Sequence, residues 1–253
     1  MSLKFGILIV AHAPLRAEAA DSSEMVTQLL FGESVEILNT NKQWVFVRCL
    51  HDNYEGWMDH KQIFSCNEND LNGWKSKATH RIFENTFEFS SELGSHTLYK
   101  GSLLPADYTD FQLGELRYKA KKPMQIIERN HSVIEYAQSY LNTPYLWGGR
   151  SFTGMDCSGF TQMVFAFLGK QLPRDASQQI NVGQLIPFED HQAGDLAFFK
   201  NENGKIIHVG MATGQGTILH AHGQITEDFL RADGIYKKQN LSKSHDLHAI
   251  KRV

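Results

Sequence analysis

The segment Gly148-Gly149-Arg150-Ser151-Phe152-Thr153-Gly154-Met155-Asp156-Cys157-Ser158-Gly159-Phe160 runs from a glycine-rich loop, through a cysteine, into a helical pattern. Apolar residues then recur at the spacing of one helix face: Phe160, Val164, Phe167 and Leu168. Gly169 follows, where a helix commonly ends. Cys157 is therefore expected in the first helical turn, where unpaired N–H groups and the helix dipole favour an anion. This position predicts a lowered thiol pKa and a nucleophilic role; a small buried cysteine is the alternative.

The composition bounds the class of protein. A chain of 253 residues allows one large domain or two to three small ones, and 42% hydrophobic with 21% charged residues is enough for a core. The formal charge of −3 argues against a nucleic-acid partner. Three cysteines, Cys49, Cys66 and Cys157, give no paired disulfide framework, which is typical of a reducing compartment.

The first residues allow two interpretations. Lys4 precedes a short apolar run at residues 5–10, and Ala17-Glu18-Ala19 is similar to the cleavage site of a secretory leader. His12 and Pro14 interrupt the run, so we favour a first strand and a cytoplasmic protein, with export as the alternative. The sequence holds no uninterrupted apolar run of about 18 residues, so no membrane span is expected.

Three regions differ in their patterns. Residues 1–65 predict a small all-β barrel or sandwich, because short apolar runs alternate with turn-rich breaks at 5–11, 25–30, 34–38, 44–50 and 55–58. Residues 66–125 predict a weaker set of strands at 78–83, 86–90, 96–100 and 111–118, after a polar break at 67–70. Residues 126–253 begin with helical patterns and continue with strands at 195–199, 205–212, 217–221 and 247–253, an α+β order.

A cysteine nucleophile requires a base, and the strands supply histidines. His208 lies in an alternating run, and His220 and His222, two residues apart on the next run, share one face. A hairpin centred on Gly214 places His208 opposite His220, whereas one centred on Gln215 places it opposite His222. The residues alone leave this register open.

Six motifs occur together in order: Tyr145-Leu146-Trp147-Gly148-Gly149, Asp156-Cys157-Ser158-Gly159-Phe160, Leu172-Pro173-Arg174-Asp175, Gly194-Asp195-Leu196, His208-Val209-Gly210 and Leu219-His220-Ala221. They resemble the NlpC-type cysteine peptidases, a bacterial cell-wall family with a papain-like fold. The resemblance implies Cys157 as nucleophile, His208 as general base and His220, in preference to His222, as the residue that orients His208. No cofactor or metal is implied.

The segments Gly32-Glu33 and Glu55-Gly56-Trp57-Met58 resemble bacterial SH3-like barrels. The implied fold class is α+β: a papain-like catalytic domain at 126–253, preceded by two small all-β SH3-like barrels at 1–65 and 66–125. This order is similar to a branch of the family, the γ-D-glutamyl-L-diamino acid endopeptidases. That branch cleaves between D-Glu and meso-diaminopimelate or Lys in peptidoglycan-derived peptides, and requires a free N-terminal L-Ala.

The same resemblance implies a set of substrate-binding residues. Asp156 is expected to hold the substrate ammonium group or to cap the helix, and Glu24 and Tyr54 of the first barrel are expected to help read that amine. The remaining candidates line the cleft: Tyr145 as an oxyanion or ligand donor, Trp147 as a wall, Ser158 beside the nucleophile, and Arg174 with Ser177 at the D-Glu α-carboxylate.

Three other classes remain open. Cys157, His208, His220 and His222 are residue types that zinc prefers, so a metal site is one alternative. A second is a wall-binding module in which the peptidase fold is inactive. A third is another papain-like chemistry, an amidase or acyl transfer, using the same nucleophile.

Overall fold

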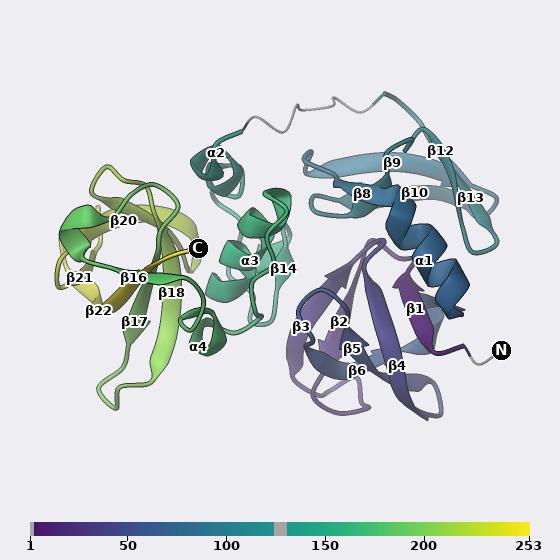
Figure 1. Cartoon of the computed structure of the whole chain (residues 1–253), viewed down its shortest axis with the longest axis horizontal. Helices are drawn as coiled ribbons and strands as arrows, with labels where there is room; N and C mark the ends of the chain where they lie inside the picture. Colours follow the sequence, from purple (N-terminus) through teal and green to yellow (C-terminus); the bar gives the residue numbers. More distant parts are fainter. Residues whose placement is uncertain (1–2, 124–130) are drawn as a thin grey trace. The chain divides into compact units, whose positions relative to one another are not determined.

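The computed structural model describes residues 3–123 and 131–253. The chain divides into unit 1, residues 1–127, and unit 2, residues 128–253 (Figure 1). The predicted boundary between residues 125 and 126 lies outside the described residues.

Unit 1 begins with a seven-stranded antiparallel sheet in the order β3-β2-β6-β5-β4-β1-β7. Its strands are β1 (Phe5–Leu8), β2 (His12–Arg16), β3 (Met25–Leu30), β4 (Ser34–Asn41), β5 (Trp44–Cys49), β6 (Glu55–Asp59) and β7 (Ile63–Cys66), with a short 3-10 turn η1 (His60–Gln62) before the last. Five of them overlap the predicted runs, and β2 and β7 were not predicted. β1 pairs with both β4 and β7, and its Ile7 and Leu8 are fully buried.

A helix follows where the sequence predicted only a polar break, so the expectation of an all-β region at 66–125 was wrong in this part. α1 (Glu68–Lys77) starts at a capping box: the Asn67 side chain accepts from the N–H groups of Asn69 and Asp70, and Asp70 accepts from the Asn67 N–H. These hydrogen bonds satisfy backbone donors that a helix start leaves unpaired. The helix is held by its buried Leu71 and Trp74.

A four-stranded sheet in the order β10-β9-β13-β12 completes unit 1, together with the pair β8–β11. Its strands are β8 (Ala78–Arg81), β9 (Thr86–Ser91), β10 (Gly94–Tyr99), β11 (Leu103–Pro105), β12 (Asp110–Leu113) and β13 (Leu116–Ala120). The predicted single strand at 111–118 is a hairpin, since Gly114 adopts φ 61° and the chain reverses between β12 and β13.

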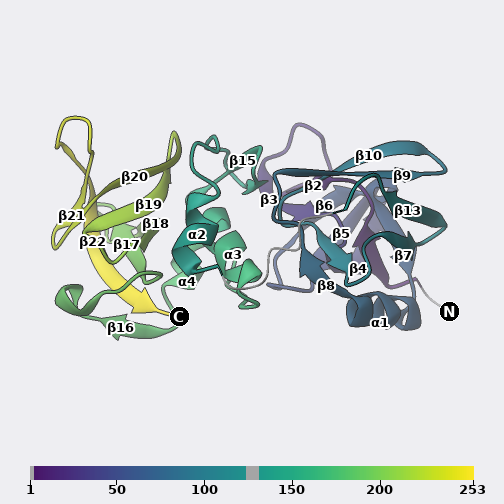
Figure 2. The same ribbon diagram turned by 90° about the horizontal axis from the view of Figure 1, so that it is seen from above.

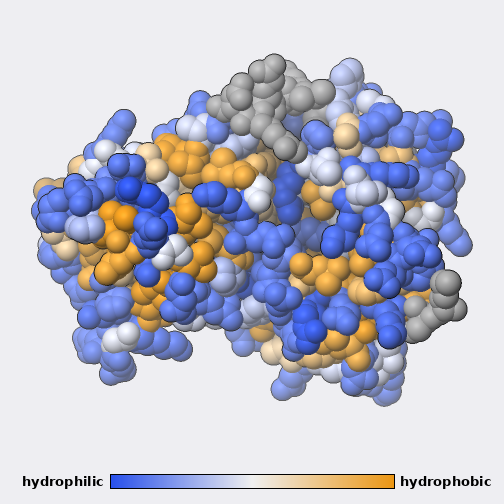
Figure 3. All heavy atoms as spheres, viewed as in Figure 1, coloured by the Kyte–Doolittle hydropathy of each residue, from blue (hydrophilic) through white to orange (hydrophobic). Residues whose placement is uncertain are grey.

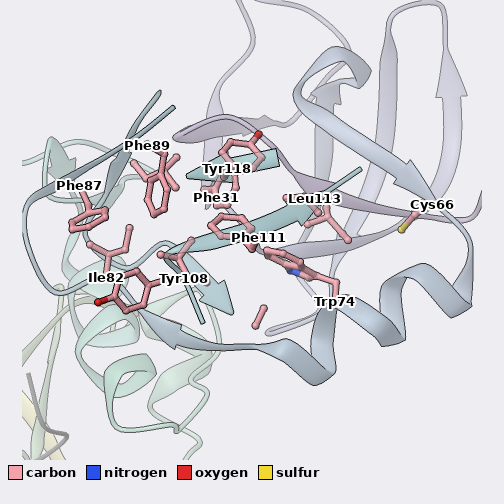
Figure 4. Close-up of a cluster of buried hydrophobic side chains, with 14 of the residues drawn as sticks. Phe31, Cys66, Trp74, Ile82, Phe87, Phe89, Tyr108, Phe111, Leu113 and Tyr118 are labelled. Atoms are coloured by element: carbon pink, nitrogen blue, oxygen red, sulfur yellow. The ribbon is translucent and has the colours of Figure 1, made fainter. Parts of the chain in front are cut away.

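Unit 1 has an aromatic core that joins its two sheets and α1 (Figure 4). Phe31, which follows β3, packs edge-on against Phe111 and Tyr118 of the second sheet, and Trp74 of α1 contacts Phe111. The Trp74 indole also donates to the Gly32 carbonyl at 2.8 Å. Aromatic edge-to-face pairs add to the apolar area that they bury, so the two halves of unit 1 stabilise each other.

Unit 2 contains a closed six-stranded antiparallel barrel. The order is β22-β17-β18-β19-β20-β21, with β21 pairing back onto β22 and β16 added outside β22. The strands are β16 (Gln184–Ile186), β17 (Leu196–Lys200), β18 (Ile206–Ala212), β19 (Thr217–His222), β20 (Gln224–Arg231), β21 (Gly234–Tyr236) and β22 (Lys243–Arg252). Four of these strands, β17, β18, β19 and β22, overlap the apolar runs that predicted them, whereas β16, β20 and β21 were not predicted. Closure removes the open sheet edge that β21 would otherwise present.

Three short helices, α2 (Val133–Gln138), α3 (Cys157–Phe167) and α4 (Ala176–Gln179), lie together on one side of this barrel (Figures 1 and 2). A small hairpin, β14 (Arg150–Ser151) with β15 (Gly154–Met155), leads into α3, and a 3-10 turn η2 (Phe188–Asp190) leads to β17. α3 is the most buried of the helices, with Phe160, Met163 and Val164 fully enclosed. Helices packed on an antiparallel sheet give the α+β class predicted for this part of the chain.

The face seen in Figure 3 is mostly hydrophilic, with apolar areas on both units. Among residues 3–123 and 131–253, no helix is long and apolar enough to cross a membrane.

Candidate active site

Cys157 is the first residue of α3, as the sequence predicted. Asp156 caps the helix: it has extended backbone, and its Oδ1 accepts from the Gly159 N–H at 2.7 Å. The other carboxylate oxygen accepts from the Gly148 N–H at 2.9 Å. One side chain therefore ties the glycine loop to the helix start and places the sulfur at the helix tip.

A buried ion pair fixes this cap. Arg174 donates from both terminal nitrogens to Asp156, at 3.0 Å and 2.6 Å, and also to the Ser158 hydroxyl at 2.9 Å. Arg174 is 1% exposed and Asp156 is 6% exposed, so the pair is shielded from water. Arg174 thus makes with Asp156 the two parallel hydrogen bonds that were expected between Arg174 and the α-carboxylate of the substrate. Both side chains therefore stabilise the start of α3. Of the two roles expected for Asp156, the structure shows the helix cap.

Glycine is required where the loop meets the helix. A Cβ on Gly159 would lie 2.2 Å from the Gly149 carbonyl oxygen, and one on Gly149 would lie 2.3 Å from the Gly154 carbonyl oxygen. Both positions are backbone-to-backbone contacts with no flexible side chain to move aside. The glycines of the Gly148–Phe160 segment thus let the loop lie directly against α3.

Three polar side chains from three adjacent strands form a buried relay. His208 of β18 lies with its Nε2 2.9 Å from Nδ1 of His220 on β19. The other ring nitrogen of His220, Nε2, lies 3.1 Å from Oδ2 of Asp228 on β20. The second Asp228 oxygen accepts from the Lys238 N–H at 2.8 Å. All three relay residues are buried, at 5%, 0% and 7% exposure.

The hydrogen bonds assign the ring protons. Because the Asp228 carboxylate only accepts, His220 donates from Nε2 and presents a lone pair at Nδ1. That lone pair accepts from Nε2–H of His208, so His208 carries its own lone pair on Nδ1. The relay therefore leaves His208 as an unprotonated base at the nitrogen that faces away from His220.

The sulfur of Cys157, at the start of α3, reaches the backbone of β18 at Val209. The Val209 N–H, next along the chain from His208, hydrogen-bonds the sulfur and acts to lower its pKa. Burial and the Asp156 carboxylate act in the opposite direction and prevail, raising the pKa of the Cys157 thiol to about 11. The lowered pKa predicted from the helix position was wrong for this resting state, because desolvation outweighs the helix tip.

The pKa of His208 lies well below its ordinary value, owing to burial first and to the nearby rings of His220, His245 and His222 second. With the pKa of the Cys157 thiol raised and that of the His208 imidazole lowered, both groups are neutral in the resting state. A neutral thiol and a neutral imidazole of this kind can react by general-base activation, in which the thiolate forms as the imidazole takes the proton.

For Asp228, burial acts to raise the pKa, but the hydrogen bonds from His220 and from the Lys238 N–H outweigh it and the net pKa is lowered. The carboxylate is therefore ionised at neutral pH and favours positive charge on the relay. Asp228 was missed from the sequence because β20 was not predicted; the single Gly223 between two runs was the available signal for a hairpin.

A fourth histidine, His245 of β22, was also missed. Its ring stacks on His208 with centroids 4.4 Å apart and planes inclined by 20°. Burial, followed by the charges of His220, His222 and Lys237, lowers the pKa of His245 to about 4. His222 lies farther out: it is exposed, and its ring centroid is 5.9 Å from that of His220.

The geometry alters the zinc alternative considered from the sequence. Among the described residues, the groups that bring possible ligand atoms together are His208, His220 and His245 in unit 2, and Cys49, His51 and Asp52 in unit 1. Neither group contains Cys157 or His222, so the predicted four-ligand set is not assembled.

Tyr145, Trp147 and Ser177, which the sequence predicted to bind substrate, also belong to unit 2. Tyr145 is 39% exposed, and burial followed by the charges of Cys157 and Asp156 raises its pKa to about 12. Trp147 is exposed beside the glycine loop, and Ser177 is exposed on α4.

The two residues expected from the first barrel belong to unit 1. Glu24 is exposed before β3, and Tyr54 packs against the core of the first sheet. Their contribution to the site of unit 2 stays a prediction.

A cysteine at a helix tip, a base beside it and a residue that orients the base define a cysteine hydrolase. The model of the NlpC/P60 family matches residues 142–244, and that of the bacterial dipeptidyl-peptidase Sh3 domain matches residues 15–63. The chain belongs to the NlpC/P60 family of cysteine peptidases, hydrolases that act on peptide bonds.

Two relatives and one solved structure extend the match beyond the catalytic region. The chain is 32% identical over 235 residues to the gamma-D-glutamyl-L-lysine dipeptidyl-peptidase of Bacillus subtilis (strain 168), covering 84% of this chain and 78% of the relative. It is 31% identical over 251 residues to dipeptidyl-peptidase 6 of Lysinibacillus sphaericus, covering 85% and 86%. The crystal structure of an NlpC/P60 family protein from Bacillus cereus ATCC 10987 superposes with TM-score 0.78 at 20% identity, covering 98% and 99%.

Proposed function

We propose that this peptidase cleaves the bond between γ-D-Glu and an L-diamino acid, meso-diaminopimelate or Lys, in peptidoglycan-derived peptides that carry a free N-terminal L-Ala. The observation that carries the catalytic part is the buried relay from Asp228 through His220 to His208, together with the hydrogen bond of the Cys157 sulfur to the N–H of Val209, the residue after His208. The substrate class is supported by the Bacillus subtilis relative, a gamma-D-glutamyl-L-lysine dipeptidyl-peptidase that aligns with 84% of this chain, and by the match of the dipeptidyl-peptidase Sh3 domain at residues 15–63.

In the acylation step, His208 Nδ1 takes the thiol proton as the Cys157 sulfur attacks the γ-carbonyl carbon. The new S–C bond forms, the C–N bond breaks, and the proton passes to the leaving amine of the diamino acid. A water molecule then gives its proton to the same nitrogen and adds to the thioester, which releases the L-Ala-D-Glu acid and restores the thiol. Asp228 stabilises the transient positive charge through His220.

Charge also develops on the carbonyl oxygen during attack. The first-turn N–H groups of α3 point toward the helix tip that carries Cys157, and the charge of Cys157 acts on the pKa of the Tyr145 hydroxyl. Both are donors of the type that stabilises an oxyanion. Tyr145 is thus proposed as a donor to the developing charge, with the N–H of Cys157 as its counterpart.

The test is mass spectrometry of L-Ala-γ-D-Glu-L-Lys and its meso-diaminopimelate counterpart after incubation with the protein, with Cys157→Ala as the control. We expect L-Ala-D-Glu from at least one peptide and none from the variant. N-acetylated peptides should resist cleavage, since the proposed recognition reads the free amine through Glu24 and Tyr54. Equal turnover of acetylated peptide would refute that specificity while leaving the peptidase intact.

We also propose a fold for each of the two regions that the family match leaves open. The helix-borne cysteine packed against strands that bear the histidines supports a papain-like catalytic domain, and residues 66–125 are proposed as a diverged second SH3-like barrel that acquired α1. β1 at residues 5–8 pairs with β4 and β7, as expected for a first strand. We propose a cytoplasmic site of action. Cell fractionation with a C-terminal epitope tests the location; recovery of a shortened form outside the cytoplasm would contradict it.

A further inference from the structure

Three imidazole rings from the strands β18, β19 and β22 converge in the barrel of unit 2. His208, His220 and His245 each place one ring nitrogen within 4.8 Å of the other two. We propose that this histidine trio is a binding site for a zinc-class divalent ion, and that the bound ion silences the peptidase. Ion binding stands on the histidines alone; the silencing rests on the proposed function.

The ligand chemistry follows from the hydrogen bonds. His220 donates from Nε2 to Asp228, so its Nδ1 lone pair points into the trio. A histidine ligand whose other N–H is held by a carboxylate is the arrangement that orients imidazoles on zinc. Zn–N bonds of about 2.0–2.1 Å separate two ligand nitrogens by about 3.4 Å in a tetrahedral site. The 2.9 Å gap between His208 and His220 therefore opens by a small ring rotation.

The third ligand provides the route from solvent. His245 lines an open pocket of about 570 Å³ between the β17–β18 connection and the start of β22. Two carboxylates, Glu202 and Asp246, also line this pocket. Lys200 and Lys243 line it too, and Lys243 pairs with Asp246 at 2.6 Å, so the acidic and basic side chains of the rim balance each other. The pocket gives solvent access to the partly exposed His245 ring, and water supplies the remaining coordination position.

Occupancy disables the base without any redox or covalent change. To coordinate the ion, Nε2 of His208 must offer a lone pair. The proton that Nε2 carries at rest therefore moves to Nδ1, and the imidazole stays neutral. Nδ1 is the nitrogen that must accept the thiol proton of Cys157. The ion therefore replaces the His208–His220 hydrogen bond and leaves the nucleophile without a proton acceptor.

The binding experiment uses untagged full-length Cys157→Ala, which removes the thiol as a competing ligand and needs no activity. Zn²⁺ is titrated against a chromophoric chelator, and one equivalent is expected. His51→Ala is the matched control, because it removes a histidine from the other described cluster of possible ligands and should keep that equivalent. His245→Phe keeps a planar ring against His208 and should weaken Zn²⁺ binding at least tenfold, with His245→Gln replacing it if the Phe variant does not fold.

The activity experiment uses the unmodified enzyme and follows peptide cleavage with added Zn²⁺. Inhibition should be reversed by a chelator, and His245→Phe should need at least tenfold more Zn²⁺ for half inhibition relative to its own activity. Loss of Zn²⁺ binding in Cys157→Ala, or unchanged binding in His245→Phe, overturns the site. An enzyme inactive on every peptide would instead refute the proposed function, and binding to Cys157→Ala would still decide the ion site.

Discussion

Replacing Asp228 by Asn should impair catalysis more than replacing it by Ala. The Lys238 N–H donates to one oxygen of the Asp228 carboxylate, and His220 donates to the other. An Asn amide at this position keeps its oxygen on the Lys238 N–H, so its NH₂ group faces His220. His220 must then accept at Nε2 and donate from Nδ1, and His208 must accept at Nε2 and carry its proton on Nδ1. The base is protonated at the nitrogen that should take the thiol proton.

The two variants differ in expected magnitude. Asp228→Ala removes a hydrogen bond to a charged group, worth about 1.5–3 kcal/mol, and about 1.4 kcal/mol corresponds to a tenfold rate change. Turnover should therefore fall about tenfold to a hundredfold, because His220 can still adopt either tautomer. Asp228→Asn enforces the wrong tautomer, an effect of about 10⁴ in a serine-protease triad. Since Asp228 acts here through one more ring, we expect a loss of about 10³.

The assay is steady-state cleavage of the preferred peptide, with kcat and KM determined separately. Both variants should lower kcat and leave KM within about twofold, because Asp228 does not contact the substrate. Glu227→Gln is the matched control on the same strand: its side chain contacts Lys238 and Thr217 rather than the relay, and kcat should stay near the parent value. An Asn variant as active as the Ala variant, or more active, would refute the tautomer argument.

Three further outcomes concern stability. Arg174→Ala leaves the buried Asp156 carboxylate without its ion pair, and urea unfolding should show a loss of about 3 kcal/mol; a loss below about 1 kcal/mol would contradict the buried pair. Gly159→Ala places a Cβ 2.2 Å from a backbone oxygen and should lower both Tm and activity, whereas Gly73→Ala in α1, with open space around it, should not lower Tm. Burial lowers the pKa of Lys100 from 10.5 to about 8, so the unfolded chain binds more protons between these values and stability rises with pH across that window. Lys100→Met should abolish this rise in urea titrations.

The start of α3 was predictable because its signals are local. The Asp156 cap, the cysteine and the apolar repeat all lie within a few turns of one another. The same kind of signal preceded α1 but was interpreted as a break, since Asn67 and Asp70 favour a turn and a helix start equally. What selects the helix is the burial of Trp74 against Phe111, which lies far along the chain.

The relay was only partly within reach of the sequence. The β18–β19 register pairs Gly210 with His220, which is the hairpin centred on Gln215. By direct opposition this register puts His208 across from His222, yet the hydrogen bond goes to His220. The preference for His220 came from the family resemblance, and the rule of directly opposed side chains would have selected the other ring. His245 needed closure of the barrel through β22, which no local pattern predicts.

The reason for the diagonal contact lies in the sheet itself. His208 lies two residues before Gly210, and Gly210 is the residue directly opposite His220. His220 is in turn directly opposite Thr226, which lies two residues before Asp228. Each hydrogen bond of the relay therefore advances by two residues as it passes to the next strand. Diagonal neighbours are within reach of long side chains, and the twist between adjacent strands brings one diagonal closer than the other. The relay follows that shorter diagonal across β18, β19 and β20, so moving any one of its residues by two positions along its strand should break the relay even though the residue still faces the same side.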